Sequence, residues 1–343
     1  MKKELGLLCL LIVLCLTVIG IQTISQVKER QQFHQSHPND PMPKWELPRF
    51  LSGENLGNNA NLVGIYGIFG IGLGLVIITG GIDLSVGSMF ALCGVLLPMA
   101  LREWHWPWPI AVLGAIALPM LMGGVHGALI TRIKIQPFIV TLCGLMIYRS
   151  LGRFIAGDST KGFGQADGFQ SLKHIATGKL YGVPNTFVIL AVIALVMWFV
   201  LHRSTYGRYL FAVGRNEDAT RFSGISTKTV IASTYVIAGL LTGIAGILLA
   251  FYTNSVSPSI HGNSYELYGI AAAVLGGCSL RGGEGSILGI LIGTAIFRVL
   301  QNLVNLLGID SSLEFAVMGT VVLIGVLADQ YFQERAKKQI VKH

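Results

Sequence analysis

Charged residues are scarce in this sequence. Only 12% of its 343 residues are Asp, Glu, Lys or Arg, whereas 52% are hydrophobic, and the mean hydropathy is +0.63. A soluble domain carries about a quarter charged residues, so the composition argues against a soluble enzyme or binding module. Apolar runs of about 18 residues or more, long enough to cross a hydrocarbon core of roughly 30 Å, recur along the chain. The sequence therefore predicts an integral membrane protein.

Residues that build metal, disulfide or catalytic sites are few or unsuitably spaced. There is no CxxC pair, no HExxH, no paired-carboxylate spacing and no GxxxxGK[ST] phosphate loop. His126, beside three glycines, is more typical of helix packing than of a ligand. These absences argue against a membrane-embedded enzyme and predict no metal or cofactor in this chain. Five cysteines in apolar runs are interpreted as small packing residues: Cys9, Cys15, Cys93, Cys143 and Cys278.

The net charge of +8 does not indicate a nucleic-acid partner. Lys and Arg are scattered through short loops, with no basic stripe interleaved with aromatic residues. Their distribution instead follows the positive-inside rule when the N-terminus is cytoplasmic, because the outer segments carry fewer of them, mostly in two long loops. An even number of membrane crossings then places both termini in the cytoplasm.

Apolar runs and helix breakers predict an all-α polytopic membrane protein with about ten transmembrane helices. The spans lie near residues 5–23, 62–80, 84–101, 108–130, 137–156, 185–202, 229–251, 266–280, 286–304 and 312–329. The predicted organisation is a first helix in 1–23, a periplasmic loop in 24–61, a transmembrane domain in 62–330 with a cytoplasmic segment at 203–228, and a cytoplasmic tail in 331–343.

An aspartate interrupts the apolar sequence GGIDLSVGS at residues 80–88. Glycines end one helix at little cost, and Asp83 can then cap the amide of Ser85 or Val86 at the start of the next. The alternative is that Asp83 faces a water-filled path, because ionisable residues inside a membrane are usually functional. Both interpretations remain open at the level of sequence.

Glycine is abundant, with 43 residues, and its spacing predicts close helix contacts. GxxxGxxxG at residues 285–293 and a shorter ridge at Gly239 and Gly243 are typical of tightly packed membrane helices. A second glycine-rich break occupies residues 276–285. The predicted packing and break positions are Gly80, Gly81, Gly87, Gly276, Gly277, Gly282, Gly283, Gly285, Gly289 and Gly293.

The charged stretch GRNEDATRFSG, residues 214–224, predicts one short helix. Asn216 can cap its N-terminus, acidic residues suit its first turn, Glu217 can reach Arg221 at i,i+4, and Gly224 can close it. Ala219 and Phe222 form an apolar patch that a fully solvated helix does not need. The patch predicts either the bilayer interface or a partner's groove as its environment.

Four ordered motifs give the chain a resemblance to a known family. They are VIITGGIDLSVGS at 76–88, PFIVTL at 137–142, the GRY-to-SGI segment at 207–225, and YEL at 265–267 followed by the glycine-rich 271–285. From about residue 55 to 327 the chain resembles the membrane permease subunits of bacterial ABC importers for ribose, xylose, galactose, arabinose and furanosyl autoinducers. These subunits belong to the branched-chain amino acid permease-like superfamily.

The resemblance implies partners and a location. It implies an inner-membrane permease without enzymatic activity that pairs with itself or a paralogue, with cytoplasmic ATPase subunits that bind ATP and Mg, and with a periplasmic sugar-binding protein. The transported solute would be a pentose, a hexose or a related polyol or furanosyl compound. The resemblance also implies an ATPase-coupling role for Arg215, Asn216, Glu217, Asp218, Ala219, Arg221, Phe222 and Gly224. Candidates for the translocation pathway are Asp83, Ser85, Thr141 and Asn254.

The main alternative is an ion-coupled secondary transporter of a small polar solute. Such a transporter normally needs titratable carboxyl groups near the membrane midplane, whereas Asp83, Glu266, Asp310 and Glu314 all fall near predicted span ends. A passive channel would not explain a cytoplasmic docking helix. The chain departs from the family pattern in its long 22–61 insertion, in Cys278 and in Arg281, and these departures leave the solute and the docking of partners open.

Overall fold

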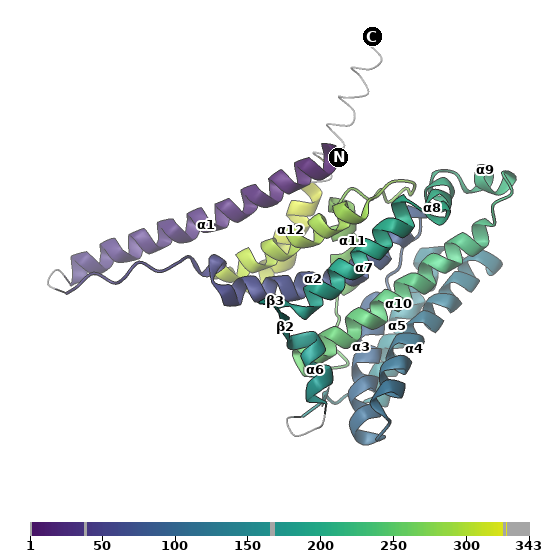
Figure 1. Ribbon diagram of the computed structural model, residues 1–343, viewed down its shortest axis with the longest axis horizontal. Coiled ribbons are helices and arrows are strands. Elements are labelled where there is room, and N and C mark those ends of the chain that lie inside the picture. The colour runs from purple at the N-terminus through teal and green to yellow at the C-terminus, as the bar shows by residue number, and fades with distance from the viewer. Residues whose placement is uncertain (1, 38–39, 165–168, 325–326, 328–343) are drawn as a thin grey trace, which may run out of the picture. The chain divides into compact units, whose positions relative to one another are not determined.

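The computed structural model describes residues 2–37, 40–164, 169–324 and 327, which fold almost entirely as helices (Figure 1). It contains two compact units, one of residues 1–60 with 295–343 and one of residues 61–294. In the first unit are α1 (Lys2–Ser36), the 3-10 turn η1 (Arg49–Leu51) and the 3-10 turn η4 (Ser311–Leu313). The long helices α2 (Gly53–Ile78) and α12 (Ile287–Leu306) contribute to both units.

The second unit holds the remaining elements. Its helices are α3 (Val86–Pro98), α4 (Trp108–Ala128), α5 (Pro137–Ile155), α6 (Gln170–Thr177), α7 (Asn185–His202), α8 (Thr205–Arg215), α9 (Glu217–Phe222), α10 (Thr227–Thr253) and α11 (Tyr265–Leu275). The π-helical turns η2 (Met99–Glu103) and η3 (Leu129–Ile133) extend α3 and α4. Two short antiparallel ladders pair β1 (Lys161–Gly162) with β4 (Ser255–Val256) and β2 (Lys179–Leu180) with β3 (Val183–Pro184).

The predicted all-α polytopic class is confirmed. Eight helices in the described part of the chain are long and apolar enough to cross a membrane. The other two predicted spans correspond to shorter helices, α11 and Glu314–Ile324. Ser264 with positive φ precedes α11 and a glycine pair follows it, which limits that helix to 11 residues. The predicted tail at 331–343 lies outside the described residues.

The loop predicted at residues 24–61 is shorter in the structure, because helices extend into it from both sides. Helix α1 continues to Ser36, since the polar sequence after its apolar part has no Gly or Pro before Pro38 and is rich in Gln, which favours helix, as do Lys28, Glu29 and Arg30. Helix α2 already begins at Gly53. Among the described residues 40–52 between them, η1 is the one regular element.

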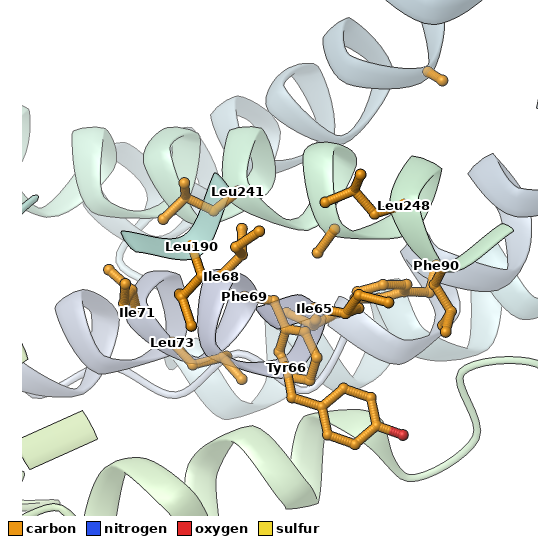
Figure 2. Close-up of a cluster of buried hydrophobic side chains, with 14 of the residues drawn as sticks. Ile65, Tyr66, Ile68, Phe69, Ile71, Leu73, Phe90, Leu190, Leu241 and Leu248 are labelled. Carbon is orange, nitrogen blue, oxygen red and sulfur yellow. The ribbon is translucent and has the colours of Figure 1, made fainter. Parts of the chain in front are cut away.

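Burial separates the helices of the second unit into core and periphery. In their most apolar stretches, 83% of the residues of α3 with η2 and 72% of those of α10 are buried, against 28% for α4 with η3, 22% for α5 and 28% for α7. Figure 2 shows the core side chains, with Phe69 of α2 next to Phe90 of α3, and Leu241 and Leu248 lining α10. The apolar outer faces of α4, α5 and α7 suit contact with lipid.

Glycine brings α4 and α10 into backbone contact, and the two helices run side by side in Figure 1. A Cβ added to Gly239 would overlap the carbonyl oxygen of Pro119, and one added to Gly123 would overlap that of Tyr235. At Gly243 it would lie 3.0 Å from Cα of Ile116. The ridge predicted at Gly239 and Gly243 is therefore confirmed as a packing surface, with its partner glycine on α4.

Candidate functional site

The first predicted helix break lies where α2 ends. Gly80 has φ +79°, its N–H donates to the carbonyl of Ile77 at 2.8 Å, and the N–H of Gly81 donates to that of Val76 at 3.0 Å. These two bonds form a Schellman motif, which satisfies the last carbonyls of a helix and favours glycine at the left-handed position. The chain then crosses five residues before α3 begins at Val86.

Asp83 lies in this break with only 2% of its surface exposed. Its Oδ1 accepts a hydrogen bond from the N–H of Ser85 at 2.9 Å and another from the Ser85 hydroxyl at 2.6 Å. The side chain therefore satisfies an amide at the start of α3, as the capping interpretation predicts. A role for Asp83 in a pathway stays a prediction.

Polar groups from three other helices converge on the same break. The Thr141 hydroxyl of α5 lies 3.3 Å from the carbonyl of Ile82, and the Tyr235 hydroxyl of α10 lies 3.4 Å from it. Close by, the hydroxyl of Tyr148 and Nε2 of His126 are 2.9 Å apart. Neither Tyr148 nor Tyr235 was among the predicted site residues. A polar side chain inside an otherwise apolar span was the available signal.

Asn254 lies elsewhere. It caps the C-terminus of α10 with φ +58°, and its carbonyl accepts from the N–H of Phe163 at 3.4 Å, beside the β1–β4 ladder. It follows Tyr235 by 19 residues along a helix, which corresponds to roughly 28 Å at 1.5 Å per residue. The structure therefore groups Asp83, Ser85 and Thr141 and places Asn254 apart from them.

We expect Asp83→Asn to leave transport within about threefold of the wild type, because the amide oxygen can still accept both bonds from Ser85 and Asn is as good a cap as Asp. Asp83→Ala, which removes the acceptor, should lower the thermal midpoint of the purified protein. Uptake rates and melting curves of the two variants test this. Loss of uptake in a stable, assembled Asp83→Asn protein would show instead that the charge acts in the pathway.

The first turns of α3 and α11 touch. A Cβ on Gly87 would overlap Oε2 of Glu266, which is 7% exposed, and the carbonyl oxygen of Gly262. Gly87 is thus a packing position, as predicted. Nearby, Nη1 of Arg149 donates to the carbonyls of His261 at 2.6 Å and Pro258 at 3.2 Å. These bonds fasten the segment between α10 and α11 to α5.

His261 gives this segment a pH dependence. Burial, and secondly the nearby Arg149, lower the pKa of His261 from 6.5 to about 4, and its Nε2 is buried without a hydrogen-bond partner. The unfolded chain therefore binds an additional proton between these values, so stability is complete above pH 6.5 and is lost as pH falls towards 4.

We expect the thermal midpoint of the wild-type protein to fall from pH 7 to pH 5 more steeply than that of His261→Gln, which cannot titrate there. Differential scanning fluorimetry of both proteins measures the difference. Equal slopes for the two proteins would contradict a depressed histidine pKa. His105→Gln, on the loop between α3 and α4, is the control for a general histidine effect.

The second predicted break follows α11 and ends that helix in the same way as the first. Gly277 has φ +90° and donates to the carbonyl of Val274 at 2.9 Å, while Cys278 donates to that of Ala273 at 2.9 Å. At the start of α12, a Cβ on Gly289 would overlap the carbonyl oxygen of Gly276. A Cβ on Gly293 would likewise overlap that of Ala272. The GxxxGxxxG sequence therefore packs α12 directly on α11.

The segment predicted to be cytoplasmic, residues 203–228, contains two helices, α8 and α9. Asn216 joins them, and its Oδ1 accepts from the N–H of Ala219 at 2.9 Å. Gly224, with φ +83°, ends α9 and donates to the carbonyl of Arg221 at 3.0 Å. The predicted capping of this short helix is confirmed at both ends.

The predicted pairing of Glu217 with Arg221 is wrong. Arg221 instead pairs with Asp218, three residues before it, at 2.7 Å. Glu217 lies beside the start of α10, where its Oε1 accepts from the Thr227 hydroxyl at 3.1 Å. A tertiary partner thus takes the place of the i,i+4 pair.

Phe222 is 85% exposed at the end of α9, and Ala219 is exposed on the same helix. Helices α8 and α9 lie at the opposite end of the second unit from α6 and the β2–β3 hairpin (Figure 1). An aromatic ring held out on a capped helix is suited to fill a groove on a partner. Among the described residues, no three His, Cys, Asp or Glu side chains group to hold a metal ion.

Comparison with known proteins identifies the family. A family model described as the permease component of the branched-chain amino acid transport system matches residues 55–327. The chain belongs to this permease family. The match covers α3 to α11 and both helix breaks, so the resemblance found in the sequence motifs is confirmed.

Several curated relatives are sugar import permeases. The ribose import permease protein of Escherichia coli K12 is 37% identical over 282 residues, 82% of this chain and 87% of the relative. That of Bacillus subtilis is 39% identical over 284 residues, again 82% and 87%. The fructose import permease protein of Rhizobium meliloti is 32% identical over 293 residues, 84% and 81%. No solved structure matches the chain.

Proposed function

We propose that this chain is the permease subunit of an ABC importer that carries a pentose, a hexose or a related polyol or furanosyl compound across the inner membrane. The observation that carries the proposal is α9, a helix capped at both ends that presents the exposed Phe222 at one end of a bundle of membrane helices. The sugar import named for the relatives supports the class of solute.

The energy for transport comes from partners. Cytoplasmic ATPase subunits bind ATP and Mg²⁺, and this chain is not itself an enzyme. A periplasmic binding protein delivers the sugar to a homodimer or heterodimer of permeases. ATP-driven closure of the ATPase pair moves rigid cytoplasmic helices, and the tightly packed bundle responds as a whole because packed interfaces shift between discrete arrangements.

Asp83, Ser85 and Thr141 are proposed to contribute to the pathway, since the structure brings them together at the first break. Hydroxyl groups and a carboxyl group there can form weak hydrogen bonds to the hydroxyls of a passing sugar. Weak contacts suit transport, because a solute that is delivered by a binding protein must also leave again.

Proteoliposomes that contain this chain, its ATPase and its binding protein test the proposal. Radiolabelled ribose, xylose, galactose and fructose are offered in turn, with and without internal ATP. We expect uptake of at least one sugar that requires ATP. Uptake that follows an imposed proton or sodium gradient without ATP would overturn the proposal in favour of an ion-coupled secondary transporter.

A further inference from the structure

Three glycine-bearing segments meet where α8 ends. A Cβ on Gly214, in the last turn of α8, would overlap the carbonyl oxygen of Ile78 at the end of α2 and the backbone nitrogen of Gly283 in the second break. A Cβ on Gly282 would lie 2.8 Å from the carbonyl oxygen of Gly214 and 2.9 Å from the nitrogen of Gly80. We call Gly214, Gly282 and Gly283 the glycine junction.

The junction joins the two helix breaks to each other as well as to α8. The N–H of Gly283 donates to the carbonyl of Ile78 at 2.8 Å, so the segment after α11 is hydrogen-bonded to the last residue of α2. Gly282 and Gly283 have φ of +84° and +76°, a conformation that favours glycine. Backbone therefore contacts backbone at this point, with no side chain between the segments.

The junction lies directly beside the proposed docking helix. Asn216, two residues after Gly214, is both the last cap of α8 and the first cap of α9. Arg215 lies between them, and a Cβ on Gly283 would come within 2.5 Å of its Cγ and 3.0 Å of its backbone nitrogen. The two residues from Gly214 to Asn216 span at most about 7 Å. A displacement of α9 must therefore also move the junction, because the connection between them is too short to take it up.

We propose that Gly214, Gly282 and Gly283 are positioning residues that transmit movement of α9 to both helix breaks at once. The inference rests on the proposed function, because it assumes that the ATPase moves α9. The first break holds Asp83 and receives Thr141, while the second ends α11, whose first turn packs on α3 through Gly87. A single contact point thereby links the ATPase to the ends of two helices that border the candidate pathway.

Gly214→Ala tests the proposal. Alanine favours helix at this position by about 1 kcal/mol, so any defect must come from the crowded contact rather than from the helix itself. In the reconstituted complex with ribose or fructose as the probe, we expect ATP hydrolysis and ATPase binding to persist. Sugar uptake per ATP hydrolysed should fall about tenfold, within the range that changes along a coupling path produce.

Two control variants separate coupling from stability. A Cβ on Gly124 in α4 would meet only Cγ2 of Val236 at 3.8 Å, so Gly124→Ala should retain the wild-type sugar uptake per ATP hydrolysed. Gly182→Ala, between β2 and β3, strains a φ of +85° but meets nothing within 4 Å, so it should lower the melting midpoint with little change in sugar uptake per ATP hydrolysed. A wild-type ratio in assembled Gly214→Ala complex would overturn the proposal.

Arg215→Ala carries the test if Gly214→Ala does not assemble, because it removes atoms that pack on Gly283 and adds none. We expect sugar uptake per ATP hydrolysed to fall in Arg215→Ala. Arg208 is exposed on the same helix, and Arg208→Ala should match the wild type. Equal uptake per ATP in the two variants would overturn the proposal. Failure of the proposed function itself is distinguishable, since uptake would then need no ATP in the unaltered protein.

Discussion

Phe222→Asp is expected to abolish ATP-driven uptake and to prevent the permease from retaining its ATPase subunits. Phe222 is 85% exposed on α9, so the substitution disturbs no core packing and should leave the melting midpoint of the permease unchanged. Removing an aromatic anchor from an interface typically costs about 2 kcal/mol or more, and a buried unpaired charge adds to that loss. Co-purification of the ATPase with the tagged permease, together with uptake in proteoliposomes, measures the effect.

Tyr181→Asp provides the matched control for this change. Tyr181 is 98% exposed and follows β2, at the opposite end of the second unit from α9 (Figure 1). The same loss of an exposed ring and gain of a charge should therefore leave ATPase retention intact. Normal retention in Phe222→Asp would rule out α9 as the docking helix. Glu217→Lys, which also loses the bond to Thr227, should weaken retention in the same direction.

Gly289→Ala is expected to cause a large loss of stability. A methyl group there would overlap the carbonyl oxygen of Gly276, and its other near neighbours are Oγ of Ser286 at 2.9 Å and the carbonyl carbon of Gly276 at 3.1 Å. Two of these three neighbours are backbone atoms and cannot rotate away. Helices α11 and α12 must therefore separate, and overpacking of this kind costs about 1–3 kcal/mol or more.

The measurement is the thermal midpoint of the detergent-purified protein and the amount that reaches the membrane. Both should fall clearly in Gly289→Ala and remain unchanged in Gly124→Ala, because an added Cβ at Gly124 would meet only Cγ2 of Val236, at 3.8 Å. An unchanged midpoint for Gly289→Ala would mean that α11 and α12 are not packed as closely as the structure shows. Gly293→Ala, which would overlap the carbonyl oxygen of Ala272, should behave like Gly289→Ala.

Local chemistry made some features predictable from the sequence. The limits of α9 follow from Asn216 and Gly224, and the end of α2 follows from Gly80, because a cap needs only residues within a few positions. The close contacts of Gly239 and Gly289 were also predictable, since small residues at a spacing of four mark the face of a helix that meets another.

Features that depend on tertiary packing could not be predicted in this way. Nothing near Glu217 indicates that Thr227 is its partner, and nothing near Asn254 indicates its distance from Asp83. The contact between Gly87 and Glu266 joins residues 179 positions apart in sequence. The length of α1 was not predicted, for a different reason. Hydropathy identifies the part of a helix that suits lipid, but it does not show whether the helix continues into a polar sequence.

That length has a geometric consequence. Helix α1 has 35 residues, or about 52 Å at 1.5 Å per residue, against a hydrocarbon core of roughly 30 Å. Its apolar residues come first, so with the N-terminus in the cytoplasm, as the charge distribution predicts, we expect the polar half after Ile21 to project from the outer face as a stalk. In that orientation, a protease added to spheroplasts should cleave the stalk at Lys28 or Arg30.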